Sequence, residues 1–170
     1  MNIEIQPDLE DPLMKEIQDH VRVCFQCQTC TSGCPVFRAL PKFKPSNIAQ
    51  QLAREGTVPY IGDMPAYWIC AGCYSCETKC PQGVDLAHIF FKLKNWAVEN
   101  NGPVPKGILS EASTMKTGVT VPINQSVLAR REKLGLPELP KPNIGEIDKI
   151  LNATKFQKKL DNLLNMEVSK

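Results

Sequence analysis

Apolar residues recur at helical spacing in four parts of the chain, and each part predicts a helix. The first helix begins at Asp11, an N-cap residue followed by proline, and continues toward Cys24. Ser46 is expected to cap the second, and Gly56 stands where glycine commonly follows a helix C-terminus. The third has the strongest apolar stripe, formed by Leu86, Ile89, Phe90, Leu93, Trp96 and Ala97.

The ends of the later helices complete this pattern. Asp85 is expected to cap the third helix, and the Asn101-Gly102 pair to end it. The fourth helix is expected to run without a break over Gly145–Met166. Strand signals are weak, because Thr117–Ile123 alternates only slightly and Pro122 lacks the N–H that a central strand needs. The pattern therefore predicts a mainly α-helical protein.

Charge and proline content divide the chain near Gly102. Residues 1–102 have a net charge of −2, and residues 103–170 a net charge of +4. Six of the 14 prolines fall within Pro103–Pro142, which favours extended chain with short ordered pieces there. We therefore expect one domain over residues 1–102, followed over 103–170 by an extended Pro-rich arm plus a C-terminal helix that docks on other subunits.

Composition excludes several classes of protein. No apolar run approaches the roughly 20 residues of a membrane span, and the first residues lack the basic and apolar regions of a secretory signal. We therefore expect a cytoplasmic protein, in which disulfides are rare. The overall charge of +2 argues against nucleic acid as the main partner.

The cysteines form two runs of identical spacing. All eight lie between Cys24 and Cys80, and residues 24–35 and 70–81 both follow the pattern C-x2-C-x2-C-x3-C-P. A [4Fe–4S] cube needs four thiolates, and in two-cluster proteins with this spacing the fourth cysteine of each run binds the other cluster. We therefore expect two [4Fe–4S] clusters with crossed ligands: Cys24, Cys27, Cys30 and Cys80 for the first, and Cys70, Cys73, Cys76 and Cys34 for the second.

Structural zinc is the main alternative, since zinc sites also use C-x2-C pairs. The third cysteine and the C-P pair, repeated in both runs, favour iron–sulfur clusters instead. Gly33 and Gly72 allow positive φ where backbone N–H groups approach sulfur, although ordinary turns would also use glycine. Phe25, Trp68 and Tyr74 adjoin cysteines, and we expect them to fill the core rather than to shield the clusters from water.

Motifs of catalysis are missing from the sequence. It contains no G-x-G-x-x-G, no P-loop and no G-x-S-x-G. His20 and His88 lie on separate predicted helices, where surface or packing roles are expected rather than metal ligation. All eight cysteines are assigned to clusters, so none remains as a nucleophile. The chain is therefore expected to conduct electrons and to have no catalytic residue of its own.

The spacing of these motifs resembles one family of iron–sulfur proteins. The Cys24–Pro35 run is followed by a helix opening at Lys44-Pro45-Ser46, then by Trp68–Cys73 and by Cys80–Asp85 before the last core helix. Over about residues 10–102 this order is similar to the α-helical ferredoxin fold of succinate dehydrogenase iron–sulfur subunits, and most of all to the C-subunit (HdrC) family of soluble heterodisulfide reductases. The resemblance implies an α-helical ferredoxin-like domain that binds two [4Fe–4S] clusters.

The family resemblance also implies a function. In methanogenesis, the C subunit is taken to pass electrons from the flavin- and iron–sulfur-containing A subunit to the cysteine-rich catalytic B subunit. That catalytic subunit reduces the mixed disulfide of coenzyme M and coenzyme B, or a related disulfide. A hydrogenase or formate dehydrogenase is expected in the larger assembly.

Two other functions fit the same motifs. One is a free dicluster ferredoxin, and the other is the iron–sulfur subunit of a succinate-dehydrogenase- or glycolate-oxidase-like enzyme. The C-terminal arm bears on this choice, because its apolar helical face could cover either a neighbouring subunit or the chain's own core.

Overall fold

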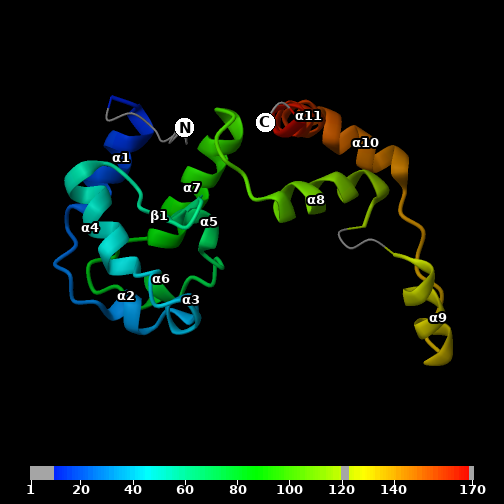
Figure 1. The fold of residues 1–170 in the computed structure, drawn as a ribbon, viewed down its shortest axis with the longest axis horizontal. Coiled ribbons are helices and arrows are strands. Elements are labelled where there is room, and N and C mark those ends of the chain that lie inside the picture. The colour runs from blue at the N-terminus through cyan, green and yellow to red at the C-terminus, as the bar shows by residue number, and fades with distance from the viewer. Residues whose placement is uncertain (1–9, 120–122, 169–170) are drawn as a thin grey trace. The chain divides into compact units, whose positions relative to one another are not determined.

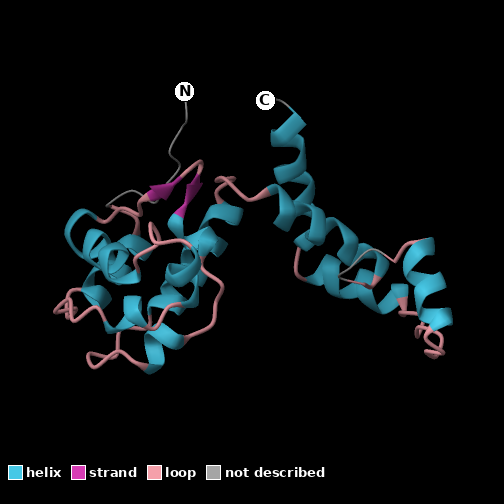
Figure 2. Cartoon of the chain, turned by 60° about the horizontal axis from the view of Figure 1, so that its bottom comes forward, coloured by secondary structure: helices cyan, strands magenta, loops and turns pink. Residues whose placement is uncertain are grey.

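Helices form nearly all of the regular structure in the computed structural model, which describes residues 10–119 and 123–168 (Figures 1 and 2). The predicted mainly α-helical fold is confirmed. The chain separates into two compact units, over residues 1–103 and 104–170. The elements of the N-terminal unit are α1 (Pro12–Val21), α2 (Thr29–Ser32), α3 (Pro35–Ala39), α4 (Pro45–Glu55), β1 (Tyr60–Ile61), β2 (Met64–Pro65), α5 (Ala66–Ile69), α6 (Ser75–Thr78) and α7 (Leu86–Glu99).

The core of the N-terminal unit is built from α1, α4 and α7. Helix α1 packs on α4, α5 packs on α7, and the phenyl rings of Phe43 and Phe90 meet edge to face at 6.1 Å. The buried apolar side chains of the three long helices are Met14, Ile17, Val21, Ile48, Ala49, Leu52, Leu86, Ala87, Ile89, Phe90, Leu93 and Ala97. The sequence did not indicate β1 and β2, a minimal antiparallel pair in which Ile61 faces Met64.

Asp11 fixes the start of α1, as the sequence predicted. Its carboxylate accepts a hydrogen bond from the Leu13 N–H at 2.8 Å, and the indole N–H of Trp96 on α7 donates to the same side chain at 2.8 Å. One side chain therefore satisfies a free N–H at the helix terminus and joins α1 to α7.

Replacing Asp11 by alanine is expected to destabilise the N-terminal unit by about 1–2 kcal/mol, since both the cap and the partner of Trp96 are lost. The measurement is the midpoint of anaerobic thermal unfolding. Asp19→Ala is the matched control on the same helix, because Asp19 forms only an exposed ion pair with Arg22 at 3.0 Å. Equal losses in the two variants would contradict the capping role.

The start of α4 differs from the prediction. The helix begins at Pro45, so Lys44 occupies the N-cap position, whereas Gly56 ends the helix at φ 62° as expected. Ser46 is buried inside the first turn, where its hydroxyl accepts from Thr31 Oγ1 at 2.8 Å and its N–H donates to Thr31 Oγ1 at 3.0 Å. Ser46 therefore ties α4 to the first cysteine run instead of capping the helix.

The start of α7 also differs in part from the prediction. Asp85 occupies the N-cap position, but its side chain makes no capping hydrogen bond and pairs with His20 of α1. The helix ends at Glu99, just before Asn101, which has φ 54°. The predicted span of the third helix is therefore confirmed, and its predicted side-chain cap is wrong.

The C-terminal unit is more helical than its prolines suggested. Its elements are α8 (Lys106–Thr114), the 3₁₀ turn η1 (Met115–Thr117), α9 (Gln125–Lys133), α10 (Ile144–Ala153) and α11 (Phe156–Val168). Among its described residues, Pro105, Pro137, Pro140 and Pro142 precede or separate these helices, where they interrupt no helical hydrogen bond. Helix α11 packs on α8 and α10, and Leu109, Leu151, Leu160 and Leu163 are buried.

The expectation of one continuous final helix is wrong. Helices α10 and α11 are separated by Thr154 and by Lys155, which has φ 55°. The Thr154 hydroxyl donates to the Ile150 carbonyl at 2.9 Å and so competes with the helical backbone. The weak strand signal at Thr117–Ile123 corresponds at its start to the end of η1 and to Gly118 at φ 75°, and residues 120–122 lie outside the described part.

Within the described ranges, no helix is long and apolar enough to cross a membrane.

Candidate metal centre

The two cysteine runs have nearly the same backbone conformation. In the first run Gln26 and Gln28 both have φ 62°, and in the second Gly72 and Tyr74 have φ 63° and 59°. The second cysteine of each run thus stands between two left-handed residues, a conformation that L side chains adopt at a cost. Loops that mix left- and right-handed residues turn N–H groups toward one side and bind anions, iron–sulfur clusters among them. The backbone of both runs therefore fits an anionic cluster.

Hydrogen-bond donors surround the cysteine sulfurs. The Thr29 hydroxyl donates to Cys27 Sγ at 3.2 Å, and Ser75 Oγ lies 3.5 Å from Cys73 Sγ in the equivalent position of the second run. Backbone N–H groups add to these bonds: Gly72 donates to Cys70 Sγ at 3.4 Å, and Val84 donates to Cys80 Sγ at 3.3 Å. Such donors stabilise thiolates, which are the form of cysteine that binds iron.

The local environment divides the thiols into two classes. The hydrogen bond with Thr29 lowers the pKa of exposed Cys27, and that with Ser75 lowers the pKa of exposed Cys73. Burial has the opposite effect on Cys30 and Cys70, and it raises the pKa of Cys76 to about 12. Cys27 and Cys73 are therefore thiolates at lower pH than Cys30, Cys70 and Cys76.

These pKa differences predict an order of alkylation in the iron-free chain. As pH rises toward 9, Cys27 and Cys73 are expected to lose their protons and to react with iodoacetamide before Cys30 and Cys70, whereas Cys76 stays a thiol. Peptide mass spectrometry at several pH values measures the order. Thr29→Val is expected to move the reaction of Cys27 to higher pH and to leave Cys73 unchanged, and an unshifted Cys27 would contradict this.

Cys34 joins the second run in space. A cavity is lined by four cysteines, Cys34, Cys70, Cys73 and Cys76, together with apolar side chains that include Phe43 and Phe90. Burial is the largest influence that raises the pKa of Cys70, and the nearby Cys34 and Cys73 thiolates add to it. The structure thus brings the last cysteine of the first run to the first three cysteines of the second.

The first run gathers its own first three cysteines. After burial, the charges of Cys24 and then Cys27 contribute to the raised pKa of Cys30. Cys80 is partly buried against the core, and α2 of the first run packs on α6 of the second. Over residues 10–119 and 123–168, no three His, Cys, Asp or Glu side chains converge as the ligands of one ion do. The four thiolates of a [4Fe–4S] cluster, by contrast, bind separate corners of a cube and need not converge on one point.

Two expectations about small and aromatic residues are corrected. Gly33 has φ −85°, so it needs no left-handed freedom, although an added Cβ would lie 2.9 Å from the Lys79 side chain. Phe25 and Tyr74 do not fill the core, since they are 58% and 40% exposed. Trp68 is half-buried, and its indole N–H donates to the Pro103 carbonyl at 2.7 Å.

Thr29 and Ser75 were missed at the sequence level. Each is a hydroxyl residue two positions after the second cysteine of its run, so an alignment of the two runs contains the signal. Lys94 was also missed. It lies one helical turn beyond Phe90 on α7, and its ammonium donates to the Cys70 carbonyl at 3.1 Å. No local motif marks that contact, because 24 residues separate its partners.

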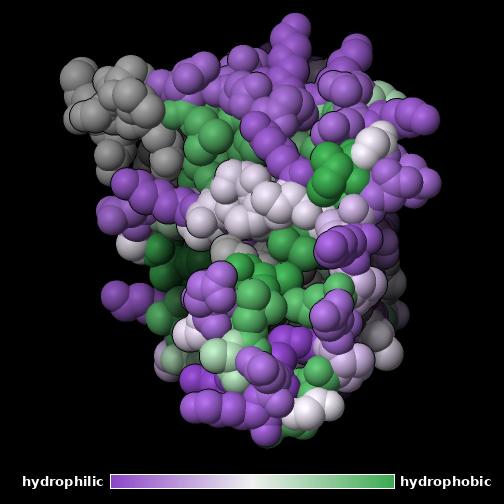
Figure 3. Space-filling model, turned by 90° about the vertical axis from the view of Figure 1, so that its right-hand side faces the viewer, coloured by the Kyte–Doolittle hydropathy of each residue, from purple (hydrophilic) through white to green (hydrophobic). Residues whose placement is uncertain are grey.

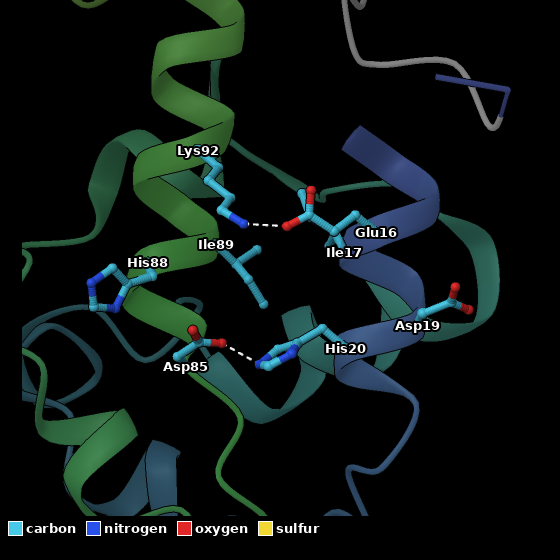
Figure 4. A pocket seen from close by; sticks show the side chains of 8 residues that line it. All are labelled: Glu16, Ile17, Asp19, His20, Asp85, His88, Ile89 and Lys92. Atoms are coloured by element: carbon cyan, nitrogen blue, oxygen red, sulfur yellow. Dashed lines mark hydrogen bonds and ion pairs between the residues drawn. The ribbon is translucent and has the colours of Figure 1, made fainter. Parts of the chain in front are cut away.

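A second cavity lies between α1 and α7 and contains no cysteine (Figure 4). His20 pairs there with Asp85, and Lys92 pairs with Glu16. His88 contacts Glu77, with its ring Nδ1 3.0 Å from the carboxylate. Both histidines therefore contact carboxylates at the surface of the unit. The residues that line this cavity are Glu16, Ile17, Asp19, His20, Asp85, His88, Ile89 and Lys92.

The helical fold, the paired loops and the donors around sulfur define a two-cluster iron–sulfur protein. Residues 20–84 match the family described as a 4Fe-4S dicluster domain. The predicted cofactors, two [4Fe–4S] clusters, are confirmed. Bound clusters accept and release single electrons, and the chain's residues supply the thiolates and the hydrogen bonds that hold them.

Comparison with known proteins narrows this class. The chain is 34% identical over 144 residues to the C subunit of the H2:CoB-CoM heterodisulfide,ferredoxin reductase of Methanothermobacter thermautotrophicus, a match that covers 81% of this chain and 77% of that protein. It is 29% identical over 169 residues to the iron–sulfur C subunit of the CoB–CoM heterodisulfide reductase of Methanopyrus kandleri, covering 92% and 84%. The C subunit of the ferredoxin:CoB-CoM heterodisulfide reductase of Methanosarcina mazei is 27% identical over 139 residues, covering 78% and 84%.

The chain belongs to the C-subunit (HdrC) family of heterodisulfide reductases, and the predicted resemblance is confirmed. It is therefore an iron–sulfur electron-transfer subunit of this class of oxidoreductase.

Proposed function

We propose that this chain relays electrons, through two clusters, from a flavin- and iron–sulfur-containing A subunit to a cysteine-rich catalytic B subunit in the cytoplasm. The catalytic subunit then reduces the disulfide of coenzymes M and B, or a related disulfide. The observation that carries the proposal is that both cluster loops reach the surface of one compact unit. Cys27 of the first run and Cys73 of the second are both exposed, so each cluster has its own edge toward a partner.

Crossed ligation is part of the proposal. The first cluster is held by Cys24, Cys27, Cys30 and Cys80, and the second by Cys70, Cys73, Cys76 and Cys34. The cavity that contains Cys34 and three cysteines of the second run supports the second set. The contact between α2 and α6 supports the exchange of ligands between runs, which keeps the two clusters close enough for rapid electron transfer.

The C-terminal unit, residues 104–170, is proposed to bind the other subunits. Its exposed apolar side chains include Leu134 and Ile150, which are 68% and 61% exposed. In the space-filling view, hydrophobic surface shows between the charged side chains (Figure 3). Such surface is costly for a free carrier and is normally covered in an assembly. No catalytic residue is proposed on this chain.

Anaerobic purification of the tagged chain from its host tests the relay. We expect stoichiometric amounts of a flavoprotein and of a second cysteine-rich subunit, with or without a hydrogenase or formate dehydrogenase. A monomer that exchanges electrons with many enzymes would instead identify a free dicluster ferredoxin. A flavoprotein dehydrogenase partner without a disulfide reductase would identify a succinate-dehydrogenase- or glycolate-oxidase-like enzyme.

Leu134→Asp tests the role of the C-terminal unit. It is expected to reduce recovery of the partner subunits at least tenfold and to leave the iron content unchanged. Glu132→Gln on the adjoining helix is the matched control and is expected to retain them. Full recovery of partners with Leu134→Asp would contradict docking through this position.

A further inference from the structure

We propose that Lys94 is a positioning residue that raises the reduction potential of the cluster bound by the second run. The inference rests on the proposed relay only in assigning Cys70, Cys73 and Cys76 to one cluster, and it holds whether or not the fourth ligands cross. It concerns how readily that cluster accepts an electron.

The contacts of Lys94 hold its ammonium beside the second run. The ammonium donates to the backbone carbonyl of Cys70 at 3.1 Å. It also lies 5.0 Å from the ring centroid of Phe91 and 5.8 Å from that of Trp68, within the range of cation–π attraction. One carbonyl and two aromatic rings therefore fix the position of this charge.

Packing keeps the arrangement in place. Phe91 lies over Gly72, where an added Cβ would come within 2.9 Å of the ring, and it stacks on Tyr74 with centroids 6.0 Å apart. Phe91 therefore covers the loop that carries Cys73 and holds Lys94 on the same side. Lys94 itself is half-buried, so water and salt screen its charge less than that of an exposed lysine.

The charge acts directly on the redox step. Reduction adds one electron to the cluster and makes it more negative, so a fixed positive charge nearby stabilises the reduced form. Burial lowers the pKa of Lys94 and raises that of Cys70, but the charge of each group favours the charged form of the other, in agreement with this sign.

Glu77 supplies an opposing charge at the same cluster. Its carboxylate adjoins Cys76, is 16% exposed, and accepts a hydrogen bond from the backbone N–H of His88 at 2.8 Å, with the His88 ring Nδ1 3.0 Å away. A neighbouring negative charge disfavours reduction, so removal of this carboxylate is expected to act in the opposite direction to removal of the Lys94 ammonium. Removal of Lys94 and removal of Glu77 are therefore expected to shift the reduction potential of this one cluster in opposite directions.

A redox titration of the anaerobically purified, cluster-loaded protein, followed by electron paramagnetic resonance, tests the assignment. Cys73→Ser identifies the signal of the second run. Lys94→Met is expected to lower the reduced-to-oxidised ratio of that cluster about tenfold at a fixed potential, a downward shift of about 59 mV for one electron. The midpoint reduction potential of the first cluster is expected to stay unchanged.

Three further variants separate charge from structure. Lys94→Arg keeps the charge and is expected to change the reduced-to-oxidised ratio of the second cluster less than about threefold. Glu77→Gln removes a negative charge and is expected to raise that ratio. Lys92→Met, on the same helix, removes an exposed lysine that pairs with Glu16 and is expected to change neither cluster. If Lys94→Met does not assemble its clusters, Lys94→Gln removes the same charge with a polar side chain and is expected to give the same downward shift.

Unchanged midpoints in Lys94→Met, or equal shifts of both clusters, would overturn the proposal. Loss of partner subunits in the anaerobic purification would overturn the relay and would leave this measurement intact.

Discussion

Cys34→Ser is expected to abolish the cluster bound by the second cysteine run, although Cys34 is a residue of the first cysteine run. Cys34 lines one cavity with Cys70, Cys73 and Cys76, so its loss removes one corner of that cluster's coordination. The iron content is expected to fall from about eight to about four atoms per chain. Iron analysis and electron paramagnetic resonance of the reduced protein measure the loss.

Cys80→Ser is the reciprocal variant and is expected to remove the cluster of the first run. Cys27→Ser provides the reference spectrum, because Cys27 belongs to the first cluster in any scheme. Crossed ligation would be wrong if Cys34→Ser and Cys27→Ser abolished the same signal.

Phe90→Ala is expected to destabilise the N-terminal unit by about 3–5 kcal/mol. Phe90 is 1% exposed, meets Phe43 edge to face and lines the cavity of the second run. Its truncation leaves a void in the core and opens a path for water to one cluster. The midpoint of anaerobic thermal unfolding is expected to fall by about 12 °C or more, and the visible absorption of the clusters is expected to bleach faster in air.

Phe25→Ala is the matched control, since Phe25 is 58% exposed. It is expected to change the stability by no more than about 0.5 kcal/mol. If both variants unfolded at the same temperature, Phe90 would not be a structural residue of the core.

The cofactor could be predicted from the sequence because its chemistry is local. Ligand spacing within each run depends on a few consecutive residues, and the repeated C-P pair marks both runs. Helices α1 and α7 were likewise visible, since their apolar stripes pack on one core. The Asp11 cap was predicted correctly because a cap, too, depends on near neighbours.

What the sequence did not reveal depends on contacts between distant residues. Ser46 looked like a cap, but Thr31 binds both its hydroxyl and its N–H. Asp85 also looked like a cap, but its carboxylate pairs with His20 on another helix. The helix breaks at Lys155, where the Thr154 hydroxyl competes with the backbone for the Ile150 carbonyl. The apolar pattern of the sequence continues across this break and therefore did not reveal it.

The burial of Cys34 has a consequence for biogenesis. This thiol is 6% exposed, and its cavity is walled by Phe43 and Phe90, which are each 1% exposed. Metal binding of this kind is coupled to folding, so the bond from Cys34 to the second cluster and the closure of the core around Phe43 and Phe90 are expected to form together.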